Sequence, residues 1–199
     1  VSKEIFGINM IQNLDYQRFK TSLQIATFFL VVIWLVHIIQ WFSPLDFTHY
    51  GILPQQVRGL KGIFFSPFLH SQKNWSHIIN NSTTLFAGIL MLYYFYSTIA
   101  HRTLLFIYLF TGASVWFIAG FFIQSKYAYH IGASGVVYGL ISFIFWSGIF
   151  RKNVRAIILS LITVLMYSGL VVGLFPDAAG EISWQSHVAG AFFGMLLAY

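Results

Sequence analysis

The chain has 199 residues, of which 58% are hydrophobic, 20% aromatic and only 8% charged. Soluble globular domains carry about a quarter charged residues, so this composition excludes a soluble domain and indicates a polytopic membrane protein. The absence of cysteine excludes disulfides, thiolate metal sites and a cysteine nucleophile. The net charge of +6 comes from dispersed cations, with no basic run that would indicate nucleic acid as a partner. We therefore expect the lipid bilayer to surround most of the chain.

Six apolar segments come close to the roughly 20 residues that a helix needs to cross a bilayer. They lie at residues 21–41, 77–98, 103–122, 132–150, 156–174 and 184–199. The polar lead before the first segment is long and no small-residue cleavage site follows that segment, so we expect it to be retained as a helix. The sequence shows no internal repeat. It predicts one all-α domain over residues 1–199, a polytopic membrane protein built as a six-helix transmembrane bundle.

Basic residues are distributed unequally between the two ends of these segments. Seven lie on the side of both termini and four on the other side: Lys3, Arg18, Lys20, Arg102, Arg151, Lys152 and Arg155 against Arg58, Lys61, Lys73 and Lys126. Because positive residues concentrate on the cytoplasmic side, both termini are predicted to be cytoplasmic. The long aromatic connection at residues 42–76 is predicted to lie half immersed in the outer interface.

Polar residues gather at one predicted depth, where the second, fourth and sixth segments each begin near the outer face. The sequence HIINN places His77 and Asn81 one helical turn apart, GASG carries Ser134, and SHVAGAFFG carries His187. A single serine or asparagine in such a place more often serves helix packing. Four polar residues at one depth, however, should face the bundle interior and each other, which indicates a functional site.

These residue types suit nucleophilic catalysis. A serine hydroxyl becomes a nucleophile when a neighbouring imidazole accepts its proton. The developing oxyanion needs donors, and His77, Asn81 and the backbone N–H of Ser134 can supply them. The five acidic residues lie outside the apolar segments: Glu4, Asp15, Asp46, Asp177 and Glu181. The sequence therefore predicts a serine–histidine dyad without a carboxylate, and neither a catalytic metal nor a cofactor.

The motifs HIINN, GASGVVYG and HVAGAFFG, in this order on alternate segments, resemble the signature of the rhomboid intramembrane serine proteases, of the compact six-helix bacterial type represented by GlpG. The resemblance covers all six segments. It implies that Ser134 is the nucleophile and His187 the base, with His77 and Asn81 in the oxyanion hole. It also implies supporting roles around the serine, on the catalytic histidine and between helices for Gly132, Gly135, Tyr138, Gly190 and Gly194.

The resemblance further implies an intramembrane serine endopeptidase that cleaves transmembrane protein substrates near the outer face, in a bacterial inner membrane. The loop at residues 175–183 is expected to move as a cap. Three features depart from the family: the Trp-Arg pair of the first outer loop is absent, the segment at 70–77 is longer, and Ser186 replaces the usual alanine. The alternatives are a catalytically silent relative that binds membrane proteins and a small transporter.

Overall fold

The computed structural model describes residues 2–72, 75–122, 126–166, 169–176 and 183–199. Across these ranges the regular structure is helical, apart from an isolated antiparallel bridge between Ile52 and His130. The main helices are α1 (Ser2–Phe42), α3 (Ser76–Phe95), α4 (Ala100–Ile118), α6 (Ser134–Phe150), α7 (Val154–Met166) and α9 (Trp184–Ala198). The predicted all-α class is confirmed for this part of the chain.

Short helices fill the connections. Between α1 and α3 lie η1 (Thr48–Tyr50), η2 (Val57–Gly59), α2 (Gly62–Phe65) and η3 (Ser66–Phe68), while η4 (Ala119–Phe121) prolongs α4 and α8 (Gly169–Val172) follows α7. Three prolines, Pro44, Pro54 and Pro67, interrupt the first connection. Because proline lacks an N–H and clashes with the preceding turn, this segment forms only brief helical turns.

Within the described ranges, three helical stretches are long and apolar enough to cross a membrane: Gln12–Phe42, Ser76–Phe95 and Ala100–Phe121. Two shorter apolar helices are Ser134–Phe150 and Val154–Leu165. Each of the six predicted segments overlaps a helix of the structure, and the fifth is divided between α7 and α8. Residues 167–168, where the fifth segment divides, lie outside the described ranges.

Helix α1 begins at Ser2, well before the apolar segment predicted from residue 21. The lead is polar, but polar composition does not oppose a helix. It contains no proline, and Gly7 is its one glycine. The helix therefore continues through the lead until Phe42, two residues before Pro44.

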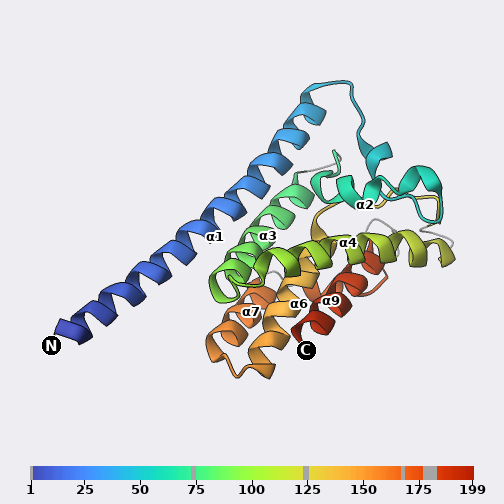
Figure 1. Cartoon of the computed structure of the whole chain (residues 1–199). Helices are drawn as coiled ribbons and strands as arrows, with labels where there is room; N and C mark the ends of the chain where they lie inside the picture. The colour runs from blue at the N-terminus through green and yellow to red at the C-terminus, as the bar shows by residue number, and fades with distance from the viewer. Residues whose placement is uncertain (1, 73–74, 123–125, 167–168, 177–182) are drawn as a thin grey trace.

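Figure 1 shows α6 and α9 side by side within the bundle, with α4 across them and α7 beside α6. Helix α3 packs against both α1 and α6, and the N-terminal part of α1 extends beyond the other helices. The fully buried side chains include Ile78, Ile89, Leu92, Leu140, Phe143 and Ile144. Helix α6 therefore lies inside the bundle and α1 at its edge.

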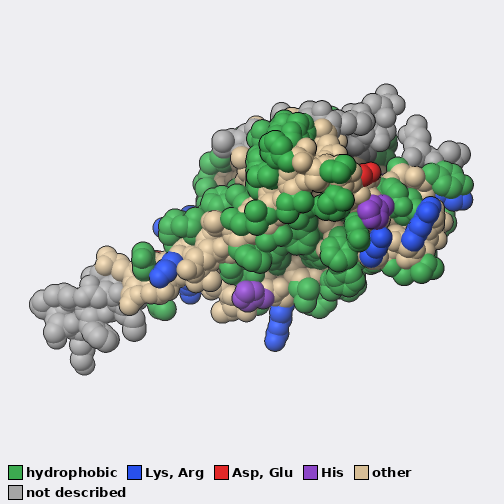
Figure 2. Space-filling model, turned by 90° about the horizontal axis from the view of Figure 1, so that it is seen from above, with side chains coloured by type: hydrophobic (Ala, Val, Ile, Leu, Met, Phe, Trp, Pro, Cys, Tyr) green, Lys and Arg blue, Asp and Glu red, His purple; other side chains and the backbone are tan. Residues whose placement is uncertain are grey.

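Large apolar side chains also cover the outside of the molecule, as Figure 2 shows for the face seen from above. Phe28 and Leu35 on α1 and Leu165 on α7 are 62%, 54% and 78% exposed. Such extensive apolar exposure would make a soluble protein aggregate, whereas lipid tails accommodate it. The surface therefore supports the predicted membrane location.

Glycines let α6 and α9 meet backbone to backbone. A Cβ built on Gly190 would lie 2.0 Å from the carbonyl oxygen of Gly135, and one on Gly194 would lie 2.1 Å from that of Gly139. Both distances are shorter than any real contact, so no larger residue fits without separating the helices. Small residues that permit close approach are a common packing device in membranes. This seam brings the start of α9 beside the start of α6.

Candidate active site

Ser134 is the first residue of α6 and follows a turn that contains Gly132. Gly132 has φ +110°, a left-handed conformation that favours glycine because it lacks a Cβ. Its N–H donates to the carbonyl oxygen of Ser66 at 2.9 Å, which fixes the turn to the first connection. As the first helical residue, Ser134 has a backbone N–H without an intrahelical acceptor.

His187 lies in the first turn of α9 and faces this serine. Its Nε2 is 2.7 Å from Oγ of Ser134, a normal hydrogen-bond distance, and only 6% of the histidine is exposed. The structure therefore brings together two residues 53 positions apart in the chain. This is the nucleophile–base geometry of serine hydrolases.

The other ring nitrogen of His187 contacts the backbone. Its Nδ1 is 2.7 Å from the carbonyl oxygen of Gly173, which follows α8. A carbonyl oxygen can only accept, so Nδ1 carries the proton and donates. In a neutral imidazole the lone pair then lies on Nε2, which accepts from the Ser134 hydroxyl. The hydrogen bonds thus define one tautomer.

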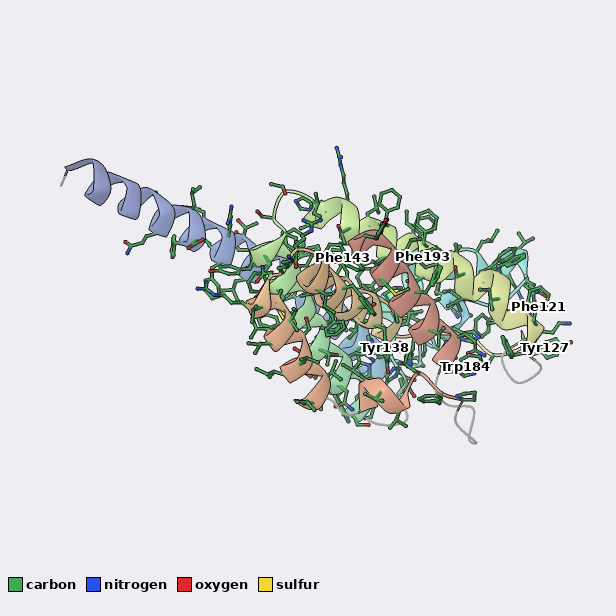
Figure 3. The ribbon with its side chains drawn as sticks, turned by 90° about the horizontal axis from the view of Figure 1, so that it is seen from below. Phe121, Tyr127, Tyr138, Phe143, Trp184 and Phe193 are labelled. Carbon is green, nitrogen blue, oxygen red and sulfur yellow. The ribbon has the colours of Figure 1, made fainter. Side chains whose placement is uncertain are left out.

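Tyr138 stacks on His187. The ring centroids are 4.2 Å apart and the planes differ by 9°. Figure 3 shows Tyr138 inside the bundle, whereas Tyr127 lies at its rim. Tyr138 lies one turn after Ser134 on α6. This helix therefore contacts His187 through both the Ser134 hydroxyl and the Tyr138 ring. The imidazole is thereby held in orientation from its face and from both nitrogens.

His77 and Asn81 lie beside Gly132. A Cβ built on Gly132 would be 2.9 Å from Nε2 of His77 and 3.8 Å from Nδ2 of Asn81. Both nitrogens therefore border the turn that carries Ser134, as the predicted oxyanion hole requires. Helix α3 supplies both residues, one turn apart.

The hydrogen bonds of His77 and Asn81 leave donors available toward this turn. The N–H of Ser71 points at Nδ1 of His77 across a long 3.5 Å, which favours the tautomer with hydrogen on Nε2. Nδ2 of Asn81 donates one hydrogen to the carbonyl oxygen of His77 at 2.9 Å. An amide carries two such hydrogens, so the second can donate elsewhere.

The chain matches the model of one known protein family. The rhomboid domain model matches residues 57–199, which include all the site residues above. The chain belongs to the rhomboid family. Members of this family are bundles of membrane helices, and they are typically intramembrane serine proteases.

Relatives of this rhomboid occur in mycobacteria. A Mycobacterium tuberculosis protein and a Mycobacterium bovis protein are each 32% identical to it over 174 residues, which is 86% of this chain and 71% of the relative. A Mycobacterium leprae protein is 29% identical, over 86% of this chain and 68% of its own length. All three are described only as uncharacterized proteins. No solved structure matches the chain.

A small, partly open cavity adjoins the turn of this rhomboid. Gly132, Gly135 and Ser186 line it on the side of the dyad helices, and Ser66 and Thr111 line it elsewhere. The Oγ1 atom of Thr111 is buried without a hydrogen-bond partner. Because this atom has almost no accessible surface, water in the cavity would contact other lining residues, such as Ser183 and Ser186.

Two further histidines border the site. Nδ1 of His130 lies 2.6 Å from Oγ of Ser183, directly before α9, so it ties the start of this helix to the connection that holds Ile52. The ring of His70 is 5.2 Å from that of His77. Burial, followed by the neighbouring His77 and His37, lowers the pKa of His70 to about 3, which keeps it neutral.

The Gly173 carbonyl is the site group that sequence reasoning missed. A backbone carbonyl has no residue signature, and Gly173 lies 14 positions before His187, outside any motif. Of the predicted cap at 175–183, residues 177–182 lie outside the described part of the chain. Ser186, the departure beside the base, donates from Oγ to the carbonyl oxygen of Ser183 at 2.7 Å and so supports the first turn of α9. Within the described ranges, no three His, Asp or Glu side chains are grouped to hold a metal.

Proposed function

We propose that this rhomboid is an intramembrane serine endopeptidase in which Ser134 is the nucleophile and His187 the general base. The observation that carries the proposal is the 2.7 Å contact between Nε2 of His187 and Oγ of Ser134. The contact of Nδ1 with Gly173 supports it, because this contact leaves the Nε2 lone pair toward the serine. Substrates are transmembrane proteins, cleaved near the outer membrane face.

The proposed reaction proceeds in two halves through an acyl-enzyme intermediate. Oγ of Ser134 attacks the scissile carbonyl carbon while Nε2 of His187 takes the hydroxyl proton. The oxyanion accepts hydrogen bonds from Nε2–H of His77, Nδ2–H of Asn81 and the N–H of Ser134. His187 then gives its proton to the leaving amine, which departs and leaves an acyl ester on Ser134. In the second half, His187 takes a proton from a water that attacks the ester carbonyl carbon. The bond between this carbon and Oγ then breaks, His187 returns the proton to Oγ of Ser134, and the carboxylic acid product leaves.

Hydrolysis inside a membrane requires water and an accessible peptide carbonyl. The cavity beside Gly135, which Ser183 and Ser186 also line, offers a place for such water. The carbonyls of a substrate helix are occupied by its own hydrogen bonds, so the substrate must unwind locally before attack. Tyr138 keeps the imidazole in orientation during both halves of the reaction.

The membrane arrangement belongs to the same proposal. All six apolar segments span the bilayer in a single domain of the compact bacterial type, in the inner membrane, with both termini cytoplasmic. The support is the distribution of basic residues, seven against four, and the apolar surface of the helices. The polar site then lies a few residues below the outer interface, where substrate and water can both reach it.

Labelling with a serine-directed fluorophosphonate tests the proposal without a known substrate. The purified protein in detergent should gain one adduct by intact mass, whereas Ser134→Ala and His187→Ala should gain none. Ser142→Ala is the matched control, because Ser142 lies on the same helix and donates to the carbonyl oxygen of Ala191 at 2.7 Å. It should label like the wild type. The proposal would be overturned if the wild type unfolds cooperatively on heating, and so is folded, but is not labelled. Labelling that persists in Ser134→Ala would also overturn it.

A further inference from the structure

Serine hydrolases usually hold the base with a carboxylate on the ring nitrogen that faces away from the nucleophile. In this chain the acidic residues lie outside the apolar segments, and the carbonyl oxygen of Gly173 occupies that place instead. We propose that the Gly173 carbonyl is the positioning group of the base, and that the dyad is competent only while the segment at 169–176 lies against His187. The inference rests on the proposed function, which it deepens.

The first argument is the tautomer. Imidazole can carry its proton on either nitrogen, and the partner of one nitrogen determines the state of the other. With Nδ1 held at 2.7 Å by an acceptor, Nε2 is the acceptor for Ser134. Without the Gly173 carbonyl, the ring is free to carry hydrogen on Nε2. It would then donate to the serine hydroxyl and could not remove its proton.

The second argument is that the carbonyl is available. Helix α8 ends at Val172, and the carbonyls that close a helix lack intrahelical donors. Two turn hydrogen bonds fix the backbone here: the N–H of Leu174 donates to Val171 at 3.3 Å and the N–H of Phe175 donates to Val172 at 3.1 Å. Gly173 itself is buried. The turn therefore presents its carbonyl inward, toward α9.

The third argument is the place of this segment in the fold. Val171, Val172 and Phe175 are 51%, 67% and 64% exposed, so the segment lies at the periphery, with apolar side chains directed outward. The dyad residues, by contrast, lie on α6 and α9, which the glycine seam fixes to each other. A displacement of this peripheral segment by an ångström or two would break the bond to Nδ1 and leave the serine–histidine distance unchanged.

Replacing one amide by an ester tests the carbonyl directly. Leucic acid in place of Leu174, introduced by nonsense suppression, converts the Gly173 carbonyl into an ester carbonyl, which is a weaker acceptor. Phenyllactic acid in place of Phe175 is the matched control: it also removes one turn hydrogen bond but leaves the Gly173 carbonyl in an amide. We expect the fluorophosphonate labelling rate to fall about 3- to 10-fold in the first variant and less than about 2-fold in the second.

The protonation state of His187 provides a readout that a merely structural effect would not change. Histidine-selective ¹⁵N NMR, with the signal assigned by comparison with His187→Ala, should show hydrogen on Nδ1 in the wild type and in the Phe175 ester. The Leu174 ester should populate the form with hydrogen on Nε2. A wild-type ring with hydrogen on Nε2, equal rates in the two esters, or an unchanged tautomer in the Leu174 ester would overturn the inference. An unlabelled wild type would overturn the proposed function, while the tautomer measurement would still test the role of Gly173.

Discussion

Gly132 is where backbone conformation and chemistry impose the same residue. Its φ of +110° favours glycine, and a Cβ there would approach Nε2 of His77 to 2.9 Å. Any larger residue would strain the turn before Ser134 and fill the space beside His77, where we propose that the oxyanion forms. Two requirements therefore select glycine at this position: the backbone conformation of the turn and the space beside His77.

Asn81 provides a test at this scale. Removing one oxyanion donor typically lowers kcat by about 100- to 1,000-fold. We expect Asn81→Ala to lower the turnover of a transmembrane substrate by about this factor with little change in KM, since the donor acts in the transition state. The control is Asn80→Ala, because Asn80 is the preceding residue and its side chain is exposed. Equal losses in the two variants would contradict the assigned role of Asn81.

His70 makes a pH-dependent contribution to stability. The pKa of this histidine is lowered to about 3 by burial, whereas an unfolded histidine titrates at about 6.5. Between these values the unfolded chain binds more protons than the folded one, so the free energy of unfolding decreases as the pH falls. We expect His70→Gln to reduce the loss of thermal stability between about pH 7 and pH 4. His49→Gln, at an exposed histidine, is the control. The same loss in the wild type and in His70→Gln would contradict this prediction.

Individual residues differed in how far the sequence could predict them. Ser134, His187, His77 and Asn81 carry distinctive side chains at one depth of the predicted spans, so their proximity could be inferred before any coordinates. The Gly173 carbonyl could not, because every residue has a carbonyl and only the path of the chain selects this one. Side-chain chemistry is visible in a sequence, whereas a backbone partner is not.

At the scale of elements, the seam between α6 and α9 holds the dyad together. We expect Gly190→Ala to lower the melting temperature by at least about 5 °C and to abolish fluorophosphonate labelling, because its Cβ would lie 2.0 Å from the carbonyl oxygen of Gly135. Gly88→Ala is the control. Its Cβ would lie 3.2 Å from the Cβ of Leu140, so the two helices need to shift by only a few tenths of an ångström. A Gly190→Ala protein with wild-type stability and labelling would show that the seam does not determine the dyad distance.

Hydrophobic length located the helices but not all of their ends. Apolar runs predict where lipid can surround a helix, and the predicted segment at 184–199 nearly coincides with α9 (Trp184–Ala198). The same runs could not predict that α1 begins at Ser2, because a helix can leave the membrane without ending. Nor could they predict where α7 ends and the short α8 begins, since the residues on both sides of this break are apolar.

At the scale of the molecule, the proposed orientation can be tested with single cysteines, because the native chain has none. Val57→Cys lies in the connection predicted to be outside, where the side chain is 83% exposed. Arg102→Cys lies on the predicted inner side. In intact cells, an impermeant maleimide should label the first variant and not the second, and permeabilisation should expose both. Labelling of Arg102→Cys alone would reverse the orientation.

The length of α1 has a mechanical consequence. Its 41 residues, at about 1.5 Å each, extend about 60 Å, which is twice the roughly 30 Å of a bilayer's hydrocarbon core. The helix is therefore about twice as long as a perpendicular crossing needs, and Figure 1 shows its N-terminal part extending beyond the bundle. A stiff helix that packs along one half and projects along the other can act as a lever. Its other half packs against α3, so we expect a sideways load on the projecting part to reach first the helix of His77 and Asn81, the proposed oxyanion donors.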